Sequence, residues 1–590
     1  MNDELWNLIK GLALKNACEH GGKAIEGPII SALLGRNPTL RPHVKELAKV
    51  VSEVVKEVNA LPHQEQCRLL NEEFPELVEW RREKEEKKLL PPLPNVSKYK
   101  VVRTRFAPNP DFYIHLGNAR PAILSSEYAK MYGGVMILRF EDTDPKIKTP
   151  TVEAYKQIRE DLTWLGVEWH EEYIQSLRMS IYYGIAKDLI SRGGAYVDLC
   201  SQEDFRKLKL ERRACPHRNA DPNTNLELFD KMLSGHFKEG EAVVRVKTDL
   251  NHPDPSVVDW VAFRIVDTSK HPHPIVGDRY VVWPTYNFAA GVDDHLMNVT
   301  HILRGREHSV NTLKQMFMYS HMGWTYPEVI NLGRLNLEGL ILSKSKIKSL
   351  IKENPDAFKG PEDIRFGTIA SLRNRGIDPQ TIRTLILEVG IKQTDASISW
   401  DNIAATNRKL IDNFTKRLMA VFNPVKMVVR NYLGPEEVII PYHPDNASLG
   451  RRSVKLSVND GTLYVMVESK DVRALKVNSA VRLMELCNVR VTAINKDLVE
   501  AEFIGRDLTQ ARELRLPIIH WVSTDVNVHL EVLKPEGLEI NVLKAVGEKE
   551  LSNLTPGDRV QLVRFGFIKI ADVIKTSTDY VNVKSIYIHD

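Results

Sequence analysis

The stretch from Val101 to Asp144 constrains the fold of this 590-residue chain more than any other. A β-branched run at 101–104 leads into a proline-containing loop, and the segment His-Leu-Gly-Asn at 115–118 then precedes a helical pattern that ends at Met131. A second strand follows. Strand, loop, helix and strand in this order predict a parallel βαβ unit, whose ligand site lies at the carboxyl ends of the strands.

The segment 115–118 would therefore lie at a helix N-terminus. Free backbone N–H groups and the positive end of the helix dipole make such a place favourable for phosphate. Because Gly117 has no Cβ, an adenine ring or a phosphate could lie flat against the backbone there. The segment predicts a nucleotide site.

Three other segments extend this pattern: Ala-Pro-Asn-Pro at 107–110, Arg-Phe-Glu-Asp-Thr-Asp at 139–144 and Ile-Leu-Ser-Lys-Ser at 341–345. Together with 115–118 they resemble the His-Ile-Gly-His and Lys-Met-Ser-Lys-Ser signatures of the class I aminoacyl-tRNA synthetases. The acidic run is similar to that of the glutamyl and glutaminyl branch, and residues 98–590 resemble archaeal glutamyl-tRNA synthetases most. Two signatures in this order are far more specific than either alone.

The chain departs from the family pattern at three positions. Phe112 stands where many members have glycine, Asn118 replaces the second histidine, and Ile341 replaces the first lysine of the second signature. None of these changes removes an obligatory group. The alternative to the family interpretation is that His115 only caps a helix or packs in a core, and that Lys344 is a solvated loop lysine.

Length and composition agree with a large soluble protein. A chain of 590 residues is long enough for several domains, and its 43% apolar content is ordinary. The formal net charge of only +4 decides nothing, because basic patches for tRNA can lie on a nearly neutral protein. No apolar run reaches membrane-spanning length and the N-terminus does not resemble a signal peptide, so a cytoplasmic protein without a membrane partner is expected.

The five cysteines do not resemble a disulfide framework, which also favours a reducing compartment. Cys18 and Cys67 suggest no chemistry and are expected to be packing residues.

The predicted fold class is multidomain. It combines an α/β Rossmann-like class I synthetase catalytic domain with an N-terminal helical extension, a helical stem and C-terminal all-β barrels, because helical periodicity early in the chain gives way to short alternating strands. The expected domains are a helical extension (1–96), the first half of the catalytic domain (97–195), an insertion that binds the tRNA acceptor end (196–279), the second catalytic half (280–358), the stem (359–421) and anticodon-binding barrels (422–590).

Two alternatives concern the ends of the chain. The extension is either a small bundle with a solvated charged face or a surface for tRNA or a partner. The β-rich end is either an anticodon reader, since barrels commonly bind splayed single-stranded bases, or a generic all-β appendage.

Amino-acid activation needs positioning and charge stabilisation rather than a covalent nucleophile. His115 and Asn118 would donate hydrogen bonds to the phosphates of ATP, and Lys344 would neutralise charge on the departing pyrophosphate. Mg²⁺ is expected with ATP. By resemblance, Glu307 would hold the ribose and the backbone near Leu342 the adenine. The full predicted ATP site comprises Pro108, Pro110, His115, Gly117, Asn118, Glu307, Leu342, Ser343, Lys344 and Ser345.

A glutamate side chain ends in a carboxylate, which a guanidinium fork matches with two hydrogen bonds. By resemblance, Arg105, Tyr286 and Arg304 surround that carboxylate, while Glu141 pairs with the amino group and Asn109 assists. Glutaminyl enzymes carry an uncharged residue where Arg304 stands. The alternative is that Arg304 pairs internally with Asp293 or Asp294.

Two closely spaced pairs, Asp198 with Cys200 and Cys215 with His217, have the spacing of a structural zinc site. Related archaeal chains would carry cysteine at the first position, and aspartate there lowers the thiolate character. The alternative is two ordinary cysteines and a surface histidine.

The resemblance implies an ATP-dependent ligase that converts L-glutamate to glutamyl-AMP and transfers it to the 3′ end of tRNA(Glu). Archaeal members typically also charge tRNA(Gln), and a monomer is the family default. The alternatives are a glutaminyl-tRNA synthetase and a catalytically inactive tRNA-binding scaffold on the same fold.

Overall fold

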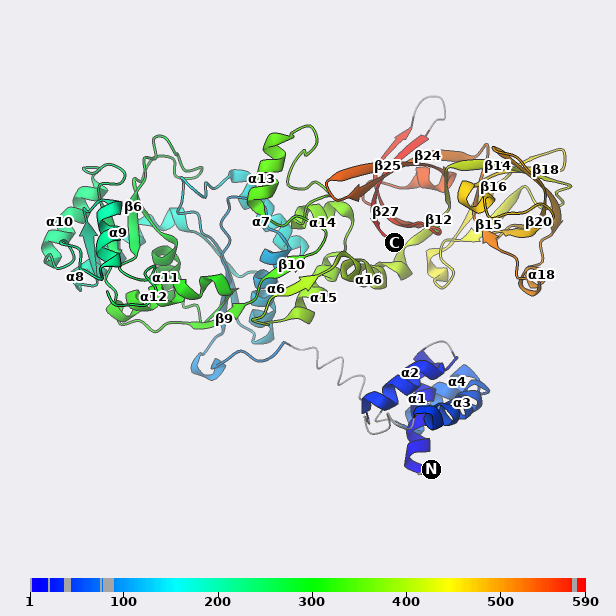
Figure 1. Cartoon of the computed structure of the whole chain (residues 1–590), viewed down its shortest axis with the longest axis horizontal. Helices are drawn as coiled ribbons and strands as arrows, with labels where there is room; N and C mark the ends of the chain where they lie inside the picture. The colour runs from blue at the N-terminus through cyan, green and yellow to red at the C-terminus, as the bar shows by residue number, and fades with distance from the viewer. Residues whose placement is uncertain (1–2, 20–21, 37–43, 75–76, 78–89, 576–580) are drawn as a thin grey trace. The chain divides into compact units, whose positions relative to one another are not determined.

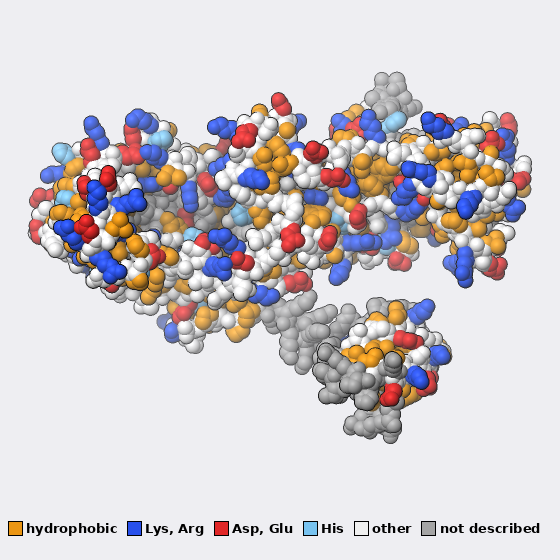
Figure 2. All heavy atoms as spheres, in the orientation of Figure 1, with side chains coloured by type: hydrophobic (Ala, Val, Ile, Leu, Met, Phe, Trp, Pro, Cys, Tyr) orange, Lys and Arg blue, Asp and Glu red, His pale blue; other side chains and the backbone are white. Residues whose placement is uncertain are grey.

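The computed structural model describes residues 3–19, 22–36, 44–74, 77, 90–575 and 581–590. The chain divides into two compact units, Met1–Pro91 and Pro92–Asp590. Among the described residues, no helix has both the length and the apolar composition that are needed to cross a membrane. On the face drawn in Figure 2, basic and acidic side chains are interspersed over the surface, in keeping with the small net charge of +4.

The first unit is a helical bundle (Figure 1). Its helices pack around one apolar core that includes Val51, Val54 and Leu33. Valines recur at helical spacing on one side of the third helix, which gives that helix a continuous buried face. The helices with described bounds are α1 (Asp3–Glu19), α2 (Glu26–Arg36), α3 (Val44–Asn59) and α4 (His63–Glu73).

Cys18 and Cys67 form a disulfide that joins α1 to α4, with their Cα atoms 5.3 Å apart. The prediction that these two cysteines are packing residues without chemistry is therefore wrong. A single long-range disulfide, unlike a framework of several bridges, leaves no sign in the number of cysteines.

The second unit begins with a five-stranded sheet in the order β3-β2-β1-β8-β9, and every neighbouring pair is parallel. Helix α6 (Leu116–Met131) connects β1 to β2, α7 (Val152–Trp164) connects β2 to β3, and α12 (Ser309–Met322) connects β8 to β9. The strand order reverses direction between β1 and β8, which is where a doubly wound sheet binds its ligand. The strands are β1 (Arg103–Phe106), β2 (Val135–Phe140), β3 (Glu171–Ile174), β8 (His301–Gly305) and β9 (Glu328–Leu332).

An antiparallel four-stranded sheet, in the order β4-β5-β6-β7, is inserted between β3 and β8. Its buried residues share one core with α8, α10, α11 and α12, built around Trp283, Phe263 and Phe288. Figure 1 shows α8, α9 and α10 beside β6. The elements are α8 (Met179–Ser191), β4 (Ala195–Asp198), α9 (Gln202–Leu210), α10 (Pro222–Leu233), β5 (Val243–Val246), β6 (Val261–Ile265), β7 (Val282–Pro284) and α11 (Tyr286–Leu296).

A mainly helical region follows β9. Short strands β10 and β11 pair in parallel within it, and α15 packs against both α6 and α16. The elements are β10 (Leu335–Leu337), α13 (Lys344–Glu353), α14 (Ile369–Arg375), α15 (Pro379–Val389), β11 (Ala396–Ile398) and α16 (Trp400–Ile411).

The C-terminal part is β-rich and has two separate apolar cores. A seven-stranded sheet runs β12-β26-β27-β28-β24-β25-β13. An eight-stranded sheet runs β17-β18-β14-β21-β20-β19-β22, and its eighth strand, β23, pairs with β18 beside this path. Burial alternates along β14 and β18, as expected for strands with one face in a core. The architecture predicted from the sequence, an α/β sheet domain with helical regions and C-terminal barrel-like sheets, is thus confirmed (Figure 1).

The strands of this part are β12 (Lys416–Leu418), β13 (Ala420–Phe422), β14 (Pro424–Arg430), β15 (Glu437–Pro441), β16 (Arg451–Lys455), β17 (Ser457–Asn459), β18 (Thr462–Glu468), β19 (Ala480–Leu483), β20 (Cys487–Ile494), β21 (Leu498–Gly505), β22 (Ile518–Ile519), β23 (Trp521–Ser523), β24 (Asn527–Glu536), β25 (Glu539–Glu548), β26 (Arg559–Leu562), β27 (Gly566–Lys575) and β28 (Val581–His589).

Candidate active site

A cavity of about 840 Å³ lies at the carboxyl ends of the parallel strands. Phe106, Gly305 and Leu332, the last residues of β1, β8 and β9, all line it. The structure brings most of the predicted nucleotide and amino-acid residues together around this one cavity. Those that line it are Arg105, Pro108, Asn109, His115, Gly117, Asn118, Glu141, Tyr286, Arg304, Glu307, Leu342 and Ser343.

His115 is the N-cap of α6. Its Nδ1 accepts a hydrogen bond from the backbone N–H of Gly117 at 3.1 Å, and Oδ1 of Asn118 accepts one from the backbone N–H of His115 at 3.2 Å. A Cβ at position 117 would lie 2.9 Å from Cε1 of His115, so glycine is needed for this cap. The signature segment therefore folds into a reciprocal capping box.

The cap also determines which ring nitrogen of His115 carries the proton. Burial, with a smaller contribution from the charge of Lys344, lowers the pKa of His115 to about 4, so the ring is neutral at neutral pH. Because Nδ1 accepts a hydrogen bond, the proton of the neutral ring lies on Nε2. That N–H is a donor for an anionic ligand.

The second signature segment starts α13. Ser343 is the N-cap, and its hydroxyl accepts a hydrogen bond from the backbone N–H of Lys346. Lys344 does not line the cavity: its Nζ lies 3.1 Å from Oδ1 of Asp111, and Nζ of Lys348 lies 3.7 Å from Oδ2 of the same carboxylate. Ser345 and Pro110, two further predicted ATP residues, also lie outside the cavity lining.

Gly367 connects the two signature loops through the backbone. Its C=O accepts from the N–H of Leu116 at 3.3 Å, and its N–H donates to the C=O of Ile341 at 2.9 Å. Two of the three departures from the family pattern meet beside it, because buried Phe112 and partly buried Ile341 belong to one apolar cluster with Phe366. Apolar residues at positions 112 and 341 thus join the loops by packing.

A network of buried charges lies behind the cavity. Oδ1 of Asp294 accepts from Nε of Arg105 at 3.2 Å and from Nη1 of Arg139 at 2.8 Å. Asp293 accepts from Nε of Arg178 at 2.9 Å and from the hydroxyl of Tyr182 at 2.6 Å. Both aspartates that were considered as internal partners of Arg304 therefore hold other arginines.

Arg304 is 5% exposed, and among the described residues no carboxylate forms an ion pair with it. Its guanidinium donates to three neutral oxygens, from Thr312, Gln315 and Tyr326. Its Nε is buried without a hydrogen-bond partner among the described residues. A buried cation whose hydrogen-bond partners are all neutral is costly, and an anion in the cavity beside Arg304 would lower this cost.

Tyr286 and Asn109 complete this end of the cavity. Burial, assisted by the charge of Glu141, raises the pKa of Tyr286 to about 12, so its hydroxyl remains a donor at neutral pH. Oδ1 of Asn109 is buried and has no hydrogen-bond partner among the described residues. The cavity therefore offers donors for a carboxylate and acceptors, from Asn109 and Glu141, for an ammonium group.

Four residues beside the site, Thr312, Gln315, Tyr326 and Asp111, were not predicted from the sequence. Thr312 and Gln315 are three residues apart on α12, directly after the strand that carries Arg304, so a helix packed back on that strand would bring them near it. The contact of Asp111 with Lys344 spans 233 residues of sequence, and no local pattern signals it.

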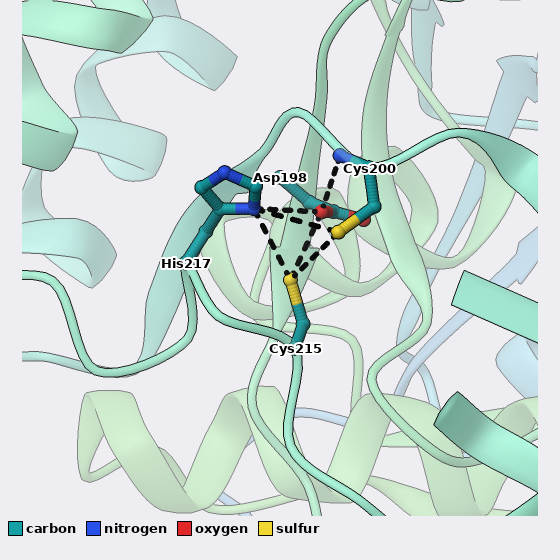
Figure 3. A group of neighbouring side chains, drawn as sticks. All are labelled: Asp198, Cys200, Cys215 and His217. Carbon is teal, nitrogen blue, oxygen red and sulfur yellow. Dashed lines mark hydrogen bonds and ion pairs between the residues drawn. The ribbon is translucent and has the colours of Figure 1, made fainter. Parts of the chain in front are cut away.

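The four predicted metal ligands form a second group, shown in Figure 3. One donor atom from each residue lies within 4.8 Å of the others. Sγ of Cys215 is 3.0 Å from Oδ1 of Asp198 and 3.3 Å from Nδ1 of His217, and Sγ of Cys200 is 3.5 Å from Sγ of Cys215. Two thiols, an imidazole and a carboxylate that converge in this way fit the donor set of tetrahedral zinc.

Arg245 supports this second group. Its Nε donates to Oδ2 of Asp198 at 2.6 Å, so the carboxylate keeps Oδ1 turned to the other three donors. The guanidinium also stacks on Phe205 of α9, with its Cζ 3.3 Å from the ring centroid.

Comparison with known proteins gives matches over most of the chain. The family model described as "tRNA synthetases class I (E and Q), catalytic domain" matches residues 101–413. Two models described as "tRNA synthetases class I (E and Q), anti-codon binding domain" match residues 415–504 and 518–571.

Proteins named "Glutamate--tRNA ligase" are similar over nearly the whole length. The one from Hyperthermus butylicus is 54% identical and covers 98% of this chain and 100% of its own length, and the one from Aeropyrum pernix is 49% identical and covers 97% and 98%. A solved glutamate tRNA ligase from Elizabethkingia meningosepticum, in complex with its amino acid, is 22% identical, with a TM-score of 0.39 over 54% of this chain and 70% of that one.

Proposed function

The chain belongs to the family of class I tRNA synthetases for glutamate and glutamine, and from this premise we propose that it is an ATP-dependent glutamate-tRNA ligase. The observation that carries the amino-acid assignment is Arg304, a buried guanidinium at the cavity with neutral partners only. The side-chain carboxylate of glutamate would supply the missing anion.

In the first step, a carboxylate oxygen of the glutamate α-carboxyl attacks the α-phosphorus of ATP. The bond between the α- and β-phosphates breaks, and pyrophosphate leaves with the electron pair. The N–H of His115 and the amide of Asn118 at the start of α6 donate to the phosphates, and the α6 dipole adds to the attraction. Magnesium bound with ATP would supply further neutralisation of the phosphate charge.

The remaining ATP contacts are those that the family resemblance implies, and they are supported by the fact that Glu307 and Leu342 both line the cavity. Glu307 is proposed to accept hydrogen bonds from the ribose, and the backbone at Leu342 to hold the adenine. Lys344 must leave Asp111 to reach the pyrophosphate, because its ammonium group is held outside the cavity.

The glutamate side chain is proposed to lie between Arg105, Tyr286 and Arg304, with its amino group against Glu141 and Asn109. With glutamine in this place, Arg304 would stay buried and unpaired, which costs several kcal/mol and lowers activity on glutamine by roughly a hundredfold or more. This is the argument against a glutaminyl-tRNA synthetase, the closest alternative function.

In the second step, the 2′-hydroxyl of the terminal adenosine of tRNA attacks the carbonyl carbon of glutamyl-AMP, and AMP leaves. The β-rich region would read the anticodon, in line with the family models that match it. By resemblance to archaeal members, the proposal includes tRNA(Gln) as a second tRNA substrate.

Asp198, Cys200, Cys215 and His217 are proposed to hold a structural zinc ion. Zinc bound there would fasten both ends of the segment that contains α9, because Cys200 precedes this helix and Cys215 follows it. Four protein ligands leave no open position for catalysis.

ATP-pyrophosphate exchange tests the activation step. The purified protein is incubated with tRNA, ATP, labelled pyrophosphate and either glutamate or glutamine. Exchange with glutamate that exceeds exchange with glutamine by about a hundredfold or more is expected. Equal or greater exchange with glutamine would overturn the substrate assignment, and no exchange with either amino acid would favour the inactive scaffold.

A further inference from the structure

We propose that Thr312, Gln315 and Tyr326 are positioning residues that make the site specific for glutamate, because they hold Arg304 through neutral oxygens only. This inference rests on the proposed function, and it adds a second layer of residues behind those that would touch the substrate. Its test separates failure of the inference from failure of the proposed function.

The contacts define how Arg304 is held. Nη2 donates to Oγ1 of Thr312 at 2.6 Å and to the hydroxyl of Tyr326 at 3.2 Å, and Nη1 lies 3.4 Å from Oε1 of Gln315. Thr312 and Gln315 come from α12, and Tyr326 from the segment before β9. Three contacts from two elements restrict the orientation of the guanidinium plane.

The three oxygens are themselves held in place. The hydroxyl of Tyr326 donates to Oε1 of Gln315 at 2.5 Å, and Nε2 of Gln315 donates to the backbone C=O of Asn287 at 3.2 Å. Gln315 is fully buried. Because its amide N–H₂ is bound to a carbonyl, Gln315 must turn its oxygen towards Arg304 and Tyr326.

Neutrality distinguishes Arg304 from its neighbours. Arg105, Arg139 and Arg178 are each bound to Asp293, Asp294 or both. Those three cations form ion pairs within the protein, whereas Arg304 feels the charge of Asp294 only from beyond ion-pair distance and contacts neutral oxygens. Hydrogen bonds that a guanidinium donates to neutral oxygens fix its direction without neutralising its charge, so its attraction for a ligand carboxylate remains.

Changes to the residues around Arg304 should alter the preference of the site for glutamate. A carboxylate in the place of Gln315 would compensate Arg304 internally, and the site would lose its preference for an anionic side chain. Loss of an orienting hydroxyl would instead leave the charge but misdirect it, which weakens the bidentate contact with glutamate.

The first test compares two tyrosine-to-phenylalanine variants. Tyr326→Phe removes the hydroxyl that contacts Arg304. Tyr319→Phe is the matched control, because its ring lies 4.7 Å from that of Tyr326 and its hydroxyl donates to the backbone C=O of Gly291 instead. Tyr326→Phe should raise KM for glutamate about tenfold and leave KM for ATP unchanged, whereas Tyr319→Phe should change neither.

The second test introduces the charge that the site lacks. Gln315→Glu keeps the size of the side chain and should lower kcat/KM for glutamate by about a hundredfold or more relative to wild type. KM for ATP in the wild type and each variant, together with thermal unfolding, shows whether the fold and the nucleotide site remain intact.

The outcomes distinguish failure of the inference about Arg304 from failure of the proposed function. If wild type activates glutamate, Tyr326→Phe retains its KM for glutamate and Gln315→Glu retains its kcat/KM for glutamate, the inference is overturned while the proposed function stands. If Tyr319→Phe raises KM for glutamate as much as Tyr326→Phe does, the effect is general packing and the inference is again overturned. If wild type does not activate glutamate, the proposed function itself fails.

Discussion

The contact between Asp111 and Lys344 gives a prediction about ATP use. Nζ of Lys344 lies 3.1 Å from Oδ1 of Asp111, and the two side chains are 29% and 15% exposed. Before Lys344 can stabilise pyrophosphate, this ion pair must break. On the proposed mechanism the pair with Asp111 is a resting position of the lysine, and removing the charge of Asp111 should make the lysine easier to recruit.

The magnitude follows from the exposure of the pair. A partly exposed ion pair contributes about 1 kcal/mol, which corresponds to about fivefold in an equilibrium. Asp111→Asn is expected to raise kcat/KM for ATP by about fivefold at low salt, and the gain should shrink at high salt because solvent ions screen the pair. The assay is pyrophosphate exchange at saturating glutamate and tRNA, with varied ATP.

Glu353→Gln serves as the control for Asp111→Asn. It removes one negative charge from the far end of α13, where the carboxylate accepts from the hydroxyl of Ser349 rather than from Lys344. This variant should behave as wild type. A fall in kcat/KM for ATP in Asp111→Asn would refute the reasoning, since it would mean that Asp111 holds Lys344 in its working position.

Three further predictions concern stability and metal binding. Burial raises the pKa of Asp161 to about 7 from an ordinary value of 3.8. The protonated carboxyl of Asp161 therefore contributes stability that is fully present below the unfolded pKa and is lost as pH rises through about 7. Asp161→Asn should remove up to about 4 kcal/mol of the resulting decline in the free energy of unfolding, measured with urea from pH 4 to 8. An unchanged pH profile in the variant would count against this prediction. Loss of the Cys18–Cys67 disulfide, which closes 49 residues of sequence, should destabilise the helical unit by about 4 kcal/mol in the double serine variant, and equal stability of variant and wild type would contradict this. Cys215→Ser should lower the zinc content, measured by elemental analysis, well below one ion per chain; the proposed zinc site is refuted if purified wild type incubated with zinc and then dialysed retains none.

Much of the site could be predicted from the sequence because its chemistry lies at the ends of regular elements. The glycine after His115, the proline-containing loop before it and the helical pattern after it together indicate a helix N-terminus that faces a ligand. The spacing of Asp198, Cys200, Cys215 and His217 likewise indicated one group, since pairs separated by one residue bring their side chains close together.

The remaining features depend on contacts between distant parts of the chain. The resting position of Lys344 depends on Asp111, the neutral environment of Arg304 on how α12 and Tyr326 pack around β8, and the disulfide on which helix faces of the first unit meet. Phe112 and Ile341 illustrate the same limit. Each stands out in sequence as a departure from the family pattern, and only the shared apolar cluster explains why both are apolar.

Aminoacylation by wild type and by Arg304→Ala tests the central claim most directly. Each protein is given radiolabelled glutamate or radiolabelled glutamine in separate reactions. Each amino acid is tested once with tRNA(Glu) and once with tRNA(Gln). Wild type should attach glutamate and not glutamine, and Arg304→Ala should lose at least about a hundredfold of that activity. Attachment of glutamine by wild type, or undiminished attachment of glutamate by Arg304→Ala, would contradict the account.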